Sequence, residues 1–318
     1  MSTAEITDTS VVFHGIALDL SGDSDLVRAT ARRFRDVPAG ARAAAGTVHL
    51  DLSDSRERDV HVAAGTRCVY DWGGVRAWYS PERDVFVADY RSIGWAMVRP
   101  AAGTASIGVG TGAPARSRAS ATRFLVTLSM SELLKRRGLY WLHAAGVTVG
   151  DGAVLLAGPS GSGKSTLAAA LAASGRALLG DDSLFLVRRR GIEVLAFPDA
   201  LGLDERSTGL ISQAFPAWSP GAAPALPSEH GFTIAGPVAT PAVIVFPVIG
   251  AGPTDAVPLS PDGALLRLAP DILLTDRGAA QAHLDVLADV VGGLPAYLLE
   301  LGPDLAVAVE TVARLAAG

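Results

Sequence analysis

Asparagine is absent from this chain of 318 residues, and cysteine and lysine are nearly so. Without asparagine the chain cannot contain the Asn-Lys-x-Asp motif with which switch GTPases read guanine, nor the catalytic-loop asparagine of eukaryotic-type protein kinases. The single cysteine, Cys68, excludes a disulfide framework and a cysteine-rich zinc module. We expect Cys68 to act as a small apolar residue within a strand.

Positive charge and long apolar runs are also limited. The 27 Lys and Arg residues include only two lysines, Lys135 and Lys164, and the net charge is −5. This balance does not favour a nucleic-acid or polyanion partner. The chain lacks an uncharged apolar run of about 18 residues, and its first residues lack the basic and apolar regions of a secretory signal. We therefore expect a cytoplasmic protein that does not enter a membrane.

The hydrophobic residues, 49% of the chain, are sufficient for a core in one or two domains. From Val11 to Gly112, short apolar runs alternate with turn residues, which predicts a β-rich domain containing one basic helix over 24–36. Its aromatic residues are expected in the core, with a peptide-binding surface as the alternative. Because 101–120 is rich in Gly, Ala, Ser and Thr, we predict an N-terminal domain at 1–118, with a role in substrate recognition, and a second domain at 119–318.

The second domain is predicted to begin with a helix over 121–137, where apolar residues recur at helical spacing before Gly138. Lys135 stands beside two arginines at the end of this helix, and we expect it to be a surface charge. The following pattern predicts strands over 140–149 and 153–157 and then a helix over 165–174.

A complete G-x-x-x-x-G-K-[ST] motif lies between the second of these strands and the helix. The glycines let successive backbone N–H groups face a polyphosphate, and the helix N-terminus adds partial positive charge. Lys164 would neutralise the β- and γ-phosphates, where the fork of an arginine is too bulky, and the Ser165 hydroxyl would ligate Mg²⁺. The motif therefore predicts that ATP and Mg²⁺ bind at Gly158, Pro159, Ser160, Gly161, Ser162, Gly163, Lys164, Ser165 and the adjoining Thr166.

Three further side chains are candidates for the chemistry. An apolar stretch at 178–180 ends in Asp181 and Asp182, of which one can take a proton from an incoming hydroxyl and the other can hold Mg²⁺. Paired acids at a strand end are also common in solvated turns. His143 precedes the loop, and a histidine in a strand is more often a satisfied core group. Spacing alone leaves both alternatives open.

Together, His143, the loop 158–165 and the pair Asp181–Asp182 resemble the C-terminal catalytic domain of HPr kinase/phosphorylase, whose fold is related to that of phosphoenolpyruvate carboxykinase. The resemblance covers roughly 139–187. It implies an α/β fold, with a P-loop kinase domain of this type behind a smaller β-rich N-terminal domain. It also implies that Asp181 is the general base for a serine hydroxyl and that His143 supports the phosphate and the acidic cluster.

The stretch 294–305 looks like the closing strand and helix of HPr-kinase-related proteins found beside peptide-modification genes, for which a ribosomally made peptide is the candidate acceptor. Two departures from the bifunctional enzymes argue against phosphorolysis and against HPr as acceptor. Thr166 replaces their acid, and 196–208 lacks their glycine-rich signature. Within that segment Arg206 is the best candidate for a positive charge at the transferred phosphate, with a plain surface arginine as the alternative.

We therefore expect an ATP- and Mg²⁺-dependent kinase acting on a serine or threonine hydroxyl of a peptide or protein. The expected catalytic residues are Asp181, Lys164, His143 and Arg206, and the expected metal ligands are Ser165 and Asp182. A small-metabolite kinase is one alternative, although that class carries its loop near the chain start. A non-catalytic nucleotide-binding regulator is the other. Because the related kinases form oligomers, self-association is a further expectation of the resemblance.

Overall fold

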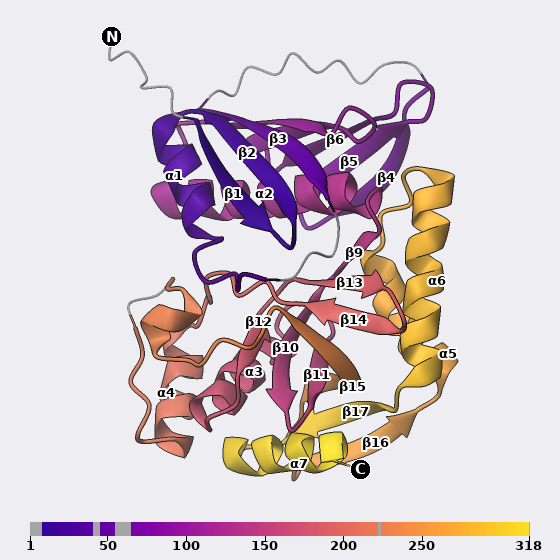
Figure 1. Ribbon diagram of the computed structural model, residues 1–318. Helices are drawn as coiled ribbons and strands as arrows, with labels where there is room; N and C mark the ends of the chain where they lie inside the picture. The colour runs from indigo at the N-terminus through magenta and orange to yellow at the C-terminus, as the bar shows by residue number, and fades with distance from the viewer. Residues whose placement is uncertain (1–7, 41–44, 55–64, 222–223, 318) are drawn as a thin grey trace. The chain divides into compact units, whose positions relative to one another are not determined.

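The computed structural model describes residues 8–40, 45–54, 65–221 and 224–317 as a mixed α/β protein with two sheets (Figure 1). Residues 1–7, at the start of the chain where no secretory signal is expected, lie outside the described residues. The chain divides into two compact units. Unit 1 comprises Met1–Arg35, Arg42–Tyr140 and Leu273–His283, and unit 2 comprises Asp36–Ala41, Trp141–Ile272 and Leu284–Gly318.

Unit 1 is built on an eight-stranded sheet in the order β1-β2-β3-β8-β7-β6-β5-β4. Its strands are β1 (Thr9–Phe13), β2 (Ile16–Gly22), β3 (Gly46–Ser53), β4 (Arg67–Trp72), β5 (Val75–Ser80), β6 (Val85–Tyr90), β7 (Gly94–Arg99) and β8 (Thr104–Val109). Helix α1 (Ser24–Arg32) packs against β1, β2 and β3, and α2 (Ala115–Lys135) packs against β6, β7 and β8. The helices contact each other, so both cover the same face of the sheet.

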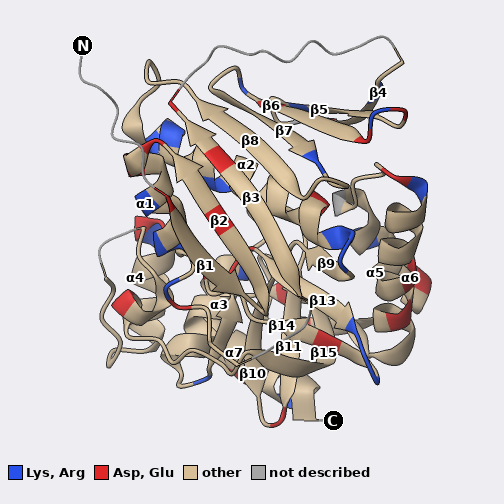
Figure 2. Ribbon diagram, turned by 45° about the horizontal axis from the view of Figure 1, so that its top comes forward, with Lys and Arg blue, Asp and Glu red and all other residues tan. Residues whose placement is uncertain are grey.

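The two faces of this sheet differ in polarity because side chains alternate along each strand. In β3, Val48, Leu50 and Leu52 are fully buried, whereas His49 and Asp51 between them are exposed. In Figure 2 acidic positions are coloured red on the ribbon of this sheet. On this polar face His49 Nδ1 lies 3.3 Å from Asp19 Oδ2. The core of unit 1 therefore lies between the sheet and its two helices.

Two element boundaries in unit 1 differ from the simplest interpretation of the sequence. The apolar stretch over 11–20 forms two strands, because His14 (φ 48°) and Gly15 (φ 95°) form a two-residue turn between β1 and β2. Helix α2 begins at Ala115 instead of Ala121. The predicted domain boundary after residue 118 thus falls inside α2, and unit 1 continues to Tyr140. The different roles of the two predicted domains stay predictions.

Lys135 and Cys68 also differ from expectation. Lys135 is buried, with Nζ 2.6 Å from Glu132 Oε1 and donating to Leu273 O at 3.0 Å. Residues Leu273–His283 belong to unit 1, and this distant segment covers the end of α2, which the local sequence does not reveal. Cys68 does lie in a strand but is exposed, because β4 is the last strand of the sheet.

Unit 2 contains a nine-stranded sheet whose main order is β12-β10-β11-β15-β14-β13-β9, with β17 pairing β15 and β16 pairing β17. The strands are β9 (Leu139–Leu142), β10 (Ala144–Val149), β11 (Gly152–Ala157), β12 (Leu178–Gly180), β13 (Leu184–Arg188), β14 (Ile192–Leu195), β15 (Val238–Ile249), β16 (Asp255–Leu259) and β17 (Ala296–Leu301). Strands β11, β15 and β17 run parallel to one another.

The helices of unit 2 are α3 (Lys164–Ala173), α4 (Glu205–Ala214), α5 (Pro261–Leu268), α6 (Arg277–Gly293), which begins in unit 1, and α7 (Leu305–Ala317), with short 3₁₀ helices η1 (Pro227–His230) and η2 (Ala269–Asp271). Helices α3 and α7 pack on each other and on β10 and β11. The core between them is apolar and includes Val154, Leu156, Leu167, Leu171 and Val312. No described helix combines the length and the apolar character needed to cross a lipid bilayer.

Candidate functional site

Three strands of unit 2 bring the predicted loop, the histidine and the acidic pair to one edge of the sheet. Ala144, the first residue of β10, pairs with Ala157, the last residue of β11, so His143 and Gly158 emerge side by side. Strand β12 runs antiparallel to β10 and ends at Gly180, which pairs with Gly146. Because neighbouring strands lie about 4.8 Å apart, Asp181 leaves the sheet roughly 10 Å from the loop.

The phosphate-loop motif adopts the strand, loop and helix arrangement that its chemistry requires. Strand β11 ends at Ala157, α3 begins at Lys164, and the loop between them curls at glycines with positive φ. The φ angles are 141° at Gly158, 82° at Gly161 and 101° at Gly163. A Cβ on Gly163 would also lie 2.8 Å from Leu301 Cδ1. The three positions therefore favour glycine by conformation, and Gly163 also by the close approach of Leu301.

Lys164 is buried and folds back onto the loop. Its Nζ donates to Gly158 O at 2.5 Å and to Pro159 O at 3.2 Å. The Ser162 Oγ is also buried within the loop and has no hydrogen-bond partner among the described residues. A phosphate group would supply acceptors to both side chains, so the loop fits a polyphosphate ligand.

His143 interrupts what the sequence predicts as one strand over 140–149, which the structure divides into β9 and β10. Its Nε2 lies 3.0 Å from Asp182 Oδ1, and its ring stacks on that of Trp141 with a centroid separation of 5.8 Å. The Trp141 Nε1 donates to Ser183 Oγ at 3.0 Å. Asp182 and Trp141 thus orient the imidazole, and Ser183 holds Trp141 in turn. His143 is not a core histidine, since a fifth of its side chain is exposed.

The two carboxylates have different surroundings. Asp181 is buried, at 4% exposure, whereas half of the Asp182 side chain is exposed. The chain folds back tightly before them, because a Cβ on Gly180 would lie 2.7 Å from Phe197 O and 2.8 Å from Ser183 O. The alternative of a solvated turn therefore does not hold for Asp181. A buried carboxylate suits a proton acceptor, and an exposed one suits a cation that keeps part of its water.

Helix α4 approaches the loop through a serine rather than through the predicted arginine. Ser207 Oγ lies 2.8 Å from Thr166 Oγ1. Asp204 caps the helix by accepting from Ser207 N at 2.7 Å, and this hydrogen bond lowers the pKa of Asp204. Arg206, on the same turn, is exposed. Its assignment to the reacting phosphate stays a prediction.

Among the described residues, no three His, Cys, Asp or Glu side chains are grouped to hold a metal ion. A hydroxyl at Ser165 and one exposed carboxylate at Asp182 nevertheless match Mg²⁺, which usually retains waters and takes its other ligands from substrate phosphates. The donor set fits a metal bound together with a nucleotide.

Sequence reasoning missed Trp141, Ser183 and Ser207. The spacing Trp141-x-His143 puts both side chains on one side of an extended chain, which could have predicted their stacking. Ser183 lies 42 residues from Trp141 in the sequence, and Ser207 lies 41 residues from Thr166. Each contact therefore depends on how the chain between the two residues folds. No local pattern signals either contact.

No protein-family model and no curated protein matches the chain. Among solved structures, an Hpr(Ser) kinase/phosphatase from Coxiella burnetii matches at 15% sequence identity over 55% of this chain and 93% of that chain, with a TM-score of 0.30. The chain thus has a weak structural similarity to that enzyme. The similarity carries no part of the functional proposal, which depends on the residues of the site.

Proposed function

We propose that this protein is an ATP- and Mg²⁺-dependent kinase that phosphorylates a serine or threonine hydroxyl of a peptide or protein. One observation carries the proposal, namely that His143, the glycine loop and a buried and an exposed aspartate leave the sheet at one edge. In open α/β sheets, ligands bind beside the ends of the strands in this way.

The loop holds and orients the nucleotide. Backbone N–H groups between Gly158 and Lys164 bind the phosphates, and the Lys164 ammonium exchanges its two loop carbonyls for phosphate oxygens. Ser165 and Asp182 would hold Mg²⁺, which supplies charge neutralisation at the phosphates when bound. His143 Nε2 lies 3.0 Å from Asp182 Oδ1 and would hold this carboxylate in position to ligate the metal.

Transfer forms a bond between the acceptor oxygen and the γ-phosphorus and breaks the bond from that phosphorus to the β,γ-bridging oxygen. The hydroxyl proton passes to the Asp181 carboxylate, and ADP leaves with the bridging oxygen. Asp181 is suited to this step because it is a buried carboxylate that leaves the sheet at the same edge as the loop. Positioning and charge neutralisation supply the rest of the rate.

The test measures transfer of labelled γ-phosphate to a library of serine- and threonine-containing peptides, with release of free phosphate measured in parallel. We expect Lys164→Ala and Asp181→Asn each to lower transfer by more than about 100-fold, since each removes a group that acts at the transferring phosphoryl. Glu193→Gln, in the β13–β14 hairpin, is the control and should transfer at the wild-type rate.

Three results would overturn the proposal. Transfer at the wild-type rate by Lys164→Ala or by Asp181→Asn would reject the catalytic role assigned to that residue. Labelling of small hydroxyl metabolites but not of any peptide would favour a metabolite kinase. Nucleotide binding with neither transfer nor phosphate release would favour a non-catalytic regulator.

A further inference from the structure

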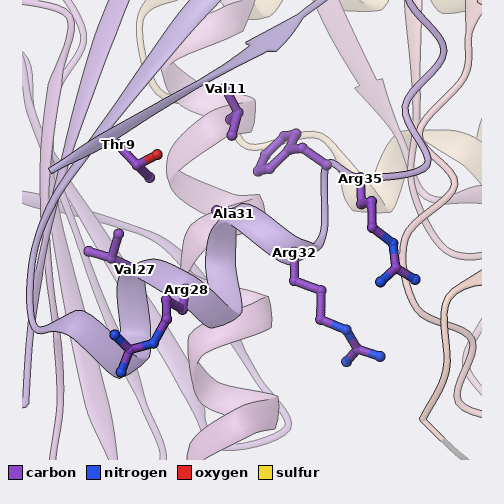
Figure 3. A pocket seen from close by; sticks show the side chains of 8 residues that line it. Thr9, Val11, Val27, Arg28, Ala31, Arg32 and Arg35 are labelled. Carbon is purple, nitrogen blue, oxygen red and sulfur yellow. The ribbon is translucent and has the colours of Figure 1, made fainter. Parts of the chain in front are cut away.

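A groove of about 490 Å³ lies in unit 1 between the first strand and the first helix of the chain. Its floor is apolar and is formed by Val11 from β1 and by Val27 and Ala31 from α1 (Figure 3). Phe34, after the helix, also lines it. Val11 and Ala31 are half-buried and so supply accessible apolar surface, whereas Val27 and Phe34 are buried, at 0% and 6% exposure. The groove is therefore an apolar surface that the rest of unit 1 does not fill.

The rim of this groove is basic. Arg28, Arg32 and Arg35 line it, and all three are exposed. In Figure 3 their side chains extend away from the apolar floor. Arg28 forms an ion pair with Asp25 at 2.6 Å, but Asp25 is almost fully exposed, so this pair holds Arg28 only weakly. The rim would complement carboxylates on a bound ligand.

One wall of the groove is an edge strand. The eight-stranded sheet begins with β1, and no described strand pairs with the other side of it. Phe13 pairs with Ile16 across the two-residue turn, and in such a hairpin this closing pair is hydrogen-bonded. Pairs then alternate, so Ser10 and Val12 direct their backbone N–H and C=O groups away from β2.

An extended peptide segment beside β1 would hydrogen-bond to these backbone groups and fill the groove at the same time. Its backbone would pair with Ser10 and Val12, and its side chains on one face would lie beside Val11, over the apolar floor. Carboxylates on the same segment would reach the rim arginines. Exposed Val12, at 66% exposure, is a large apolar side chain on the opposite face of this edge and would be partly covered.

We infer that this groove, the β1–α1 groove, binds an extended acidic peptide segment that adds as a strand to β1. The inference rests on the proposed function only in that the segment would belong to the acceptor peptide. Binding itself requires no nucleotide. The groove would give the kinase a docking element that recognises charge and backbone instead of the hydroxyl that reacts.

The first test measures binding by fluorescence anisotropy with the full chain and an uncharged dye. The probe is a peptide of about twelve residues built from Glu-Glu-Val-Thr repeats, which in a strand places Glu and Val on one face. The comparison peptide replaces each Glu with Lys. We expect the acidic peptide to bind, the basic peptide not to bind, and added salt to weaken the binding.

Charge reversal in the groove should then weaken binding by about tenfold or more, because close opposite charges become like charges. The variant is R28E/R32E/R35E, and the charge-matched control is R76E/R83E/R99E, three exposed arginines elsewhere in unit 1. Equal losses in both variants, or equal binding of the acidic and basic peptides, would overturn the assignment of the groove.

A backbone test separates strand addition from simple attraction of charges. Val12→Pro removes an outward N–H from an edge strand, where proline is tolerated, and Val12→Thr changes the same exposed side chain but keeps the N–H. We expect only the proline variant to lose about fivefold or more in affinity, in keeping with loss of a main-chain hydrogen bond. Unchanged binding by Val12→Pro would reject strand addition.

The two proposals fail separately. Lys164→Ala should bind the acidic peptide as the wild type does, because Lys164 lies in unit 2 and the groove in unit 1. Loss of peptide binding in the groove variants would support the docking site even if no transfer were found. Conversely, normal transfer with no binding of the acidic probe would reject the groove and leave the kinase proposal standing.

Discussion

Replacing Lys135 with methionine should destabilise α2 far more than a change at a surface helix end would. The Lys135 Nζ lies 2.6 Å from Glu132 Oε1, and the two side chains are 3% and 2% exposed. Lys135 also donates to Thr275 Oγ1 at 3.2 Å, and Thr275 in turn donates to Glu132 Oε2 at 2.7 Å. Methionine fills a similar volume, so the main effect is to leave the Glu132 carboxylate buried without its counter-ion.

Breaking a buried ion pair from one side costs about 3–5 kcal/mol. Removing both charges in K135M/E132L avoids that cost. It leaves the Thr275 hydroxyl to find a new partner, a loss of about 1–3 kcal/mol, whereas the Leu273 carbonyl still accepts from Thr275 N at 3.0 Å. The double variant should therefore be more stable than K135M alone. This ordering distinguishes a buried pair from an exposed one, for which the two changes would each cost less than about 1 kcal/mol.

Amide hydrogen exchange of α2 measures the effect locally. We expect exchange in the last turns of α2 to be faster in K135M by roughly 100-fold or more, from about 1.4 kcal/mol for each factor of ten. Peptides from α3, in unit 2, serve as the internal reference, and R99M, at an exposed position of unit 1, is the control. Exchange in K135M within about threefold of the wild type, or a double variant less stable than K135M, would refute the reasoning.

Three further predictions concern glycine packing and titration. Gly180→Ala should destabilise unit 2 by about 1–3 kcal/mol, because the new Cβ would lie 2.7 Å from Phe197 O, whereas Gly191→Ala, with nothing within 4 Å, should be neutral in the same urea unfolding measurement. Burial lowers the pKa of His230 below its usual 6.5, so the unfolded chain takes up a proton at a higher pH than the folded chain does. The free energy of unfolding should therefore fall as the pH drops below about 6.5. The same fall in His230→Gln, measured over the same pH series, would contradict this. Burial, aided by a hydrogen bond to the Asp84 carboxylate, raises the pKa of Tyr79 from 10.0 to about 12. The native chain therefore keeps this proton to a higher pH than the unfolded chain, and stability should decline between those two pH values. In an absorbance titration near 295 nm, the ionisation step near pH 12 should be missing in Tyr79→Phe.

Local pattern predicted the elements around the loop well. Strand β11 and helix α3 lie within one residue of the expected ranges, because glycine, apolar runs and the motif each restrict the backbone there. Local pattern was less informative at a short turn inside an apolar stretch. The turn at His14 and Gly15 divides the stretch over 11–20, and its first residue is not a glycine although it has a positive φ.

Contacts between distant segments lay beyond sequence reasoning. The family resemblance implied that His143 supports the acidic cluster, but which aspartate lies beside the imidazole depends on how the chain turns after β12. That aspartate is Asp182. Because Lys135 stands beside Arg136 at the end of a helix, its sequence context is typical of a surface residue. Two of its hydrogen-bond acceptors, Leu273 O and Thr275 Oγ1, belong to a segment more than 130 residues later in the chain. The pattern of residues along the helix does not predict these contacts.

Both lysines of the chain are buried, Lys164 in the loop and Lys135 at the end of α2. The folded protein therefore offers amine-specific reagents and lysine-specific proteases no accessible ε-amino group, although arginines are plentiful on its surface. Each lysine belongs to a different unit, so cleavage after Lys135 would report the opening of unit 1 and cleavage after Lys164 the opening of unit 2. The composition thus provides two natural proteolytic reporters of local unfolding, and slower cleavage after Lys164 in the presence of a nucleotide would show which unit holds it.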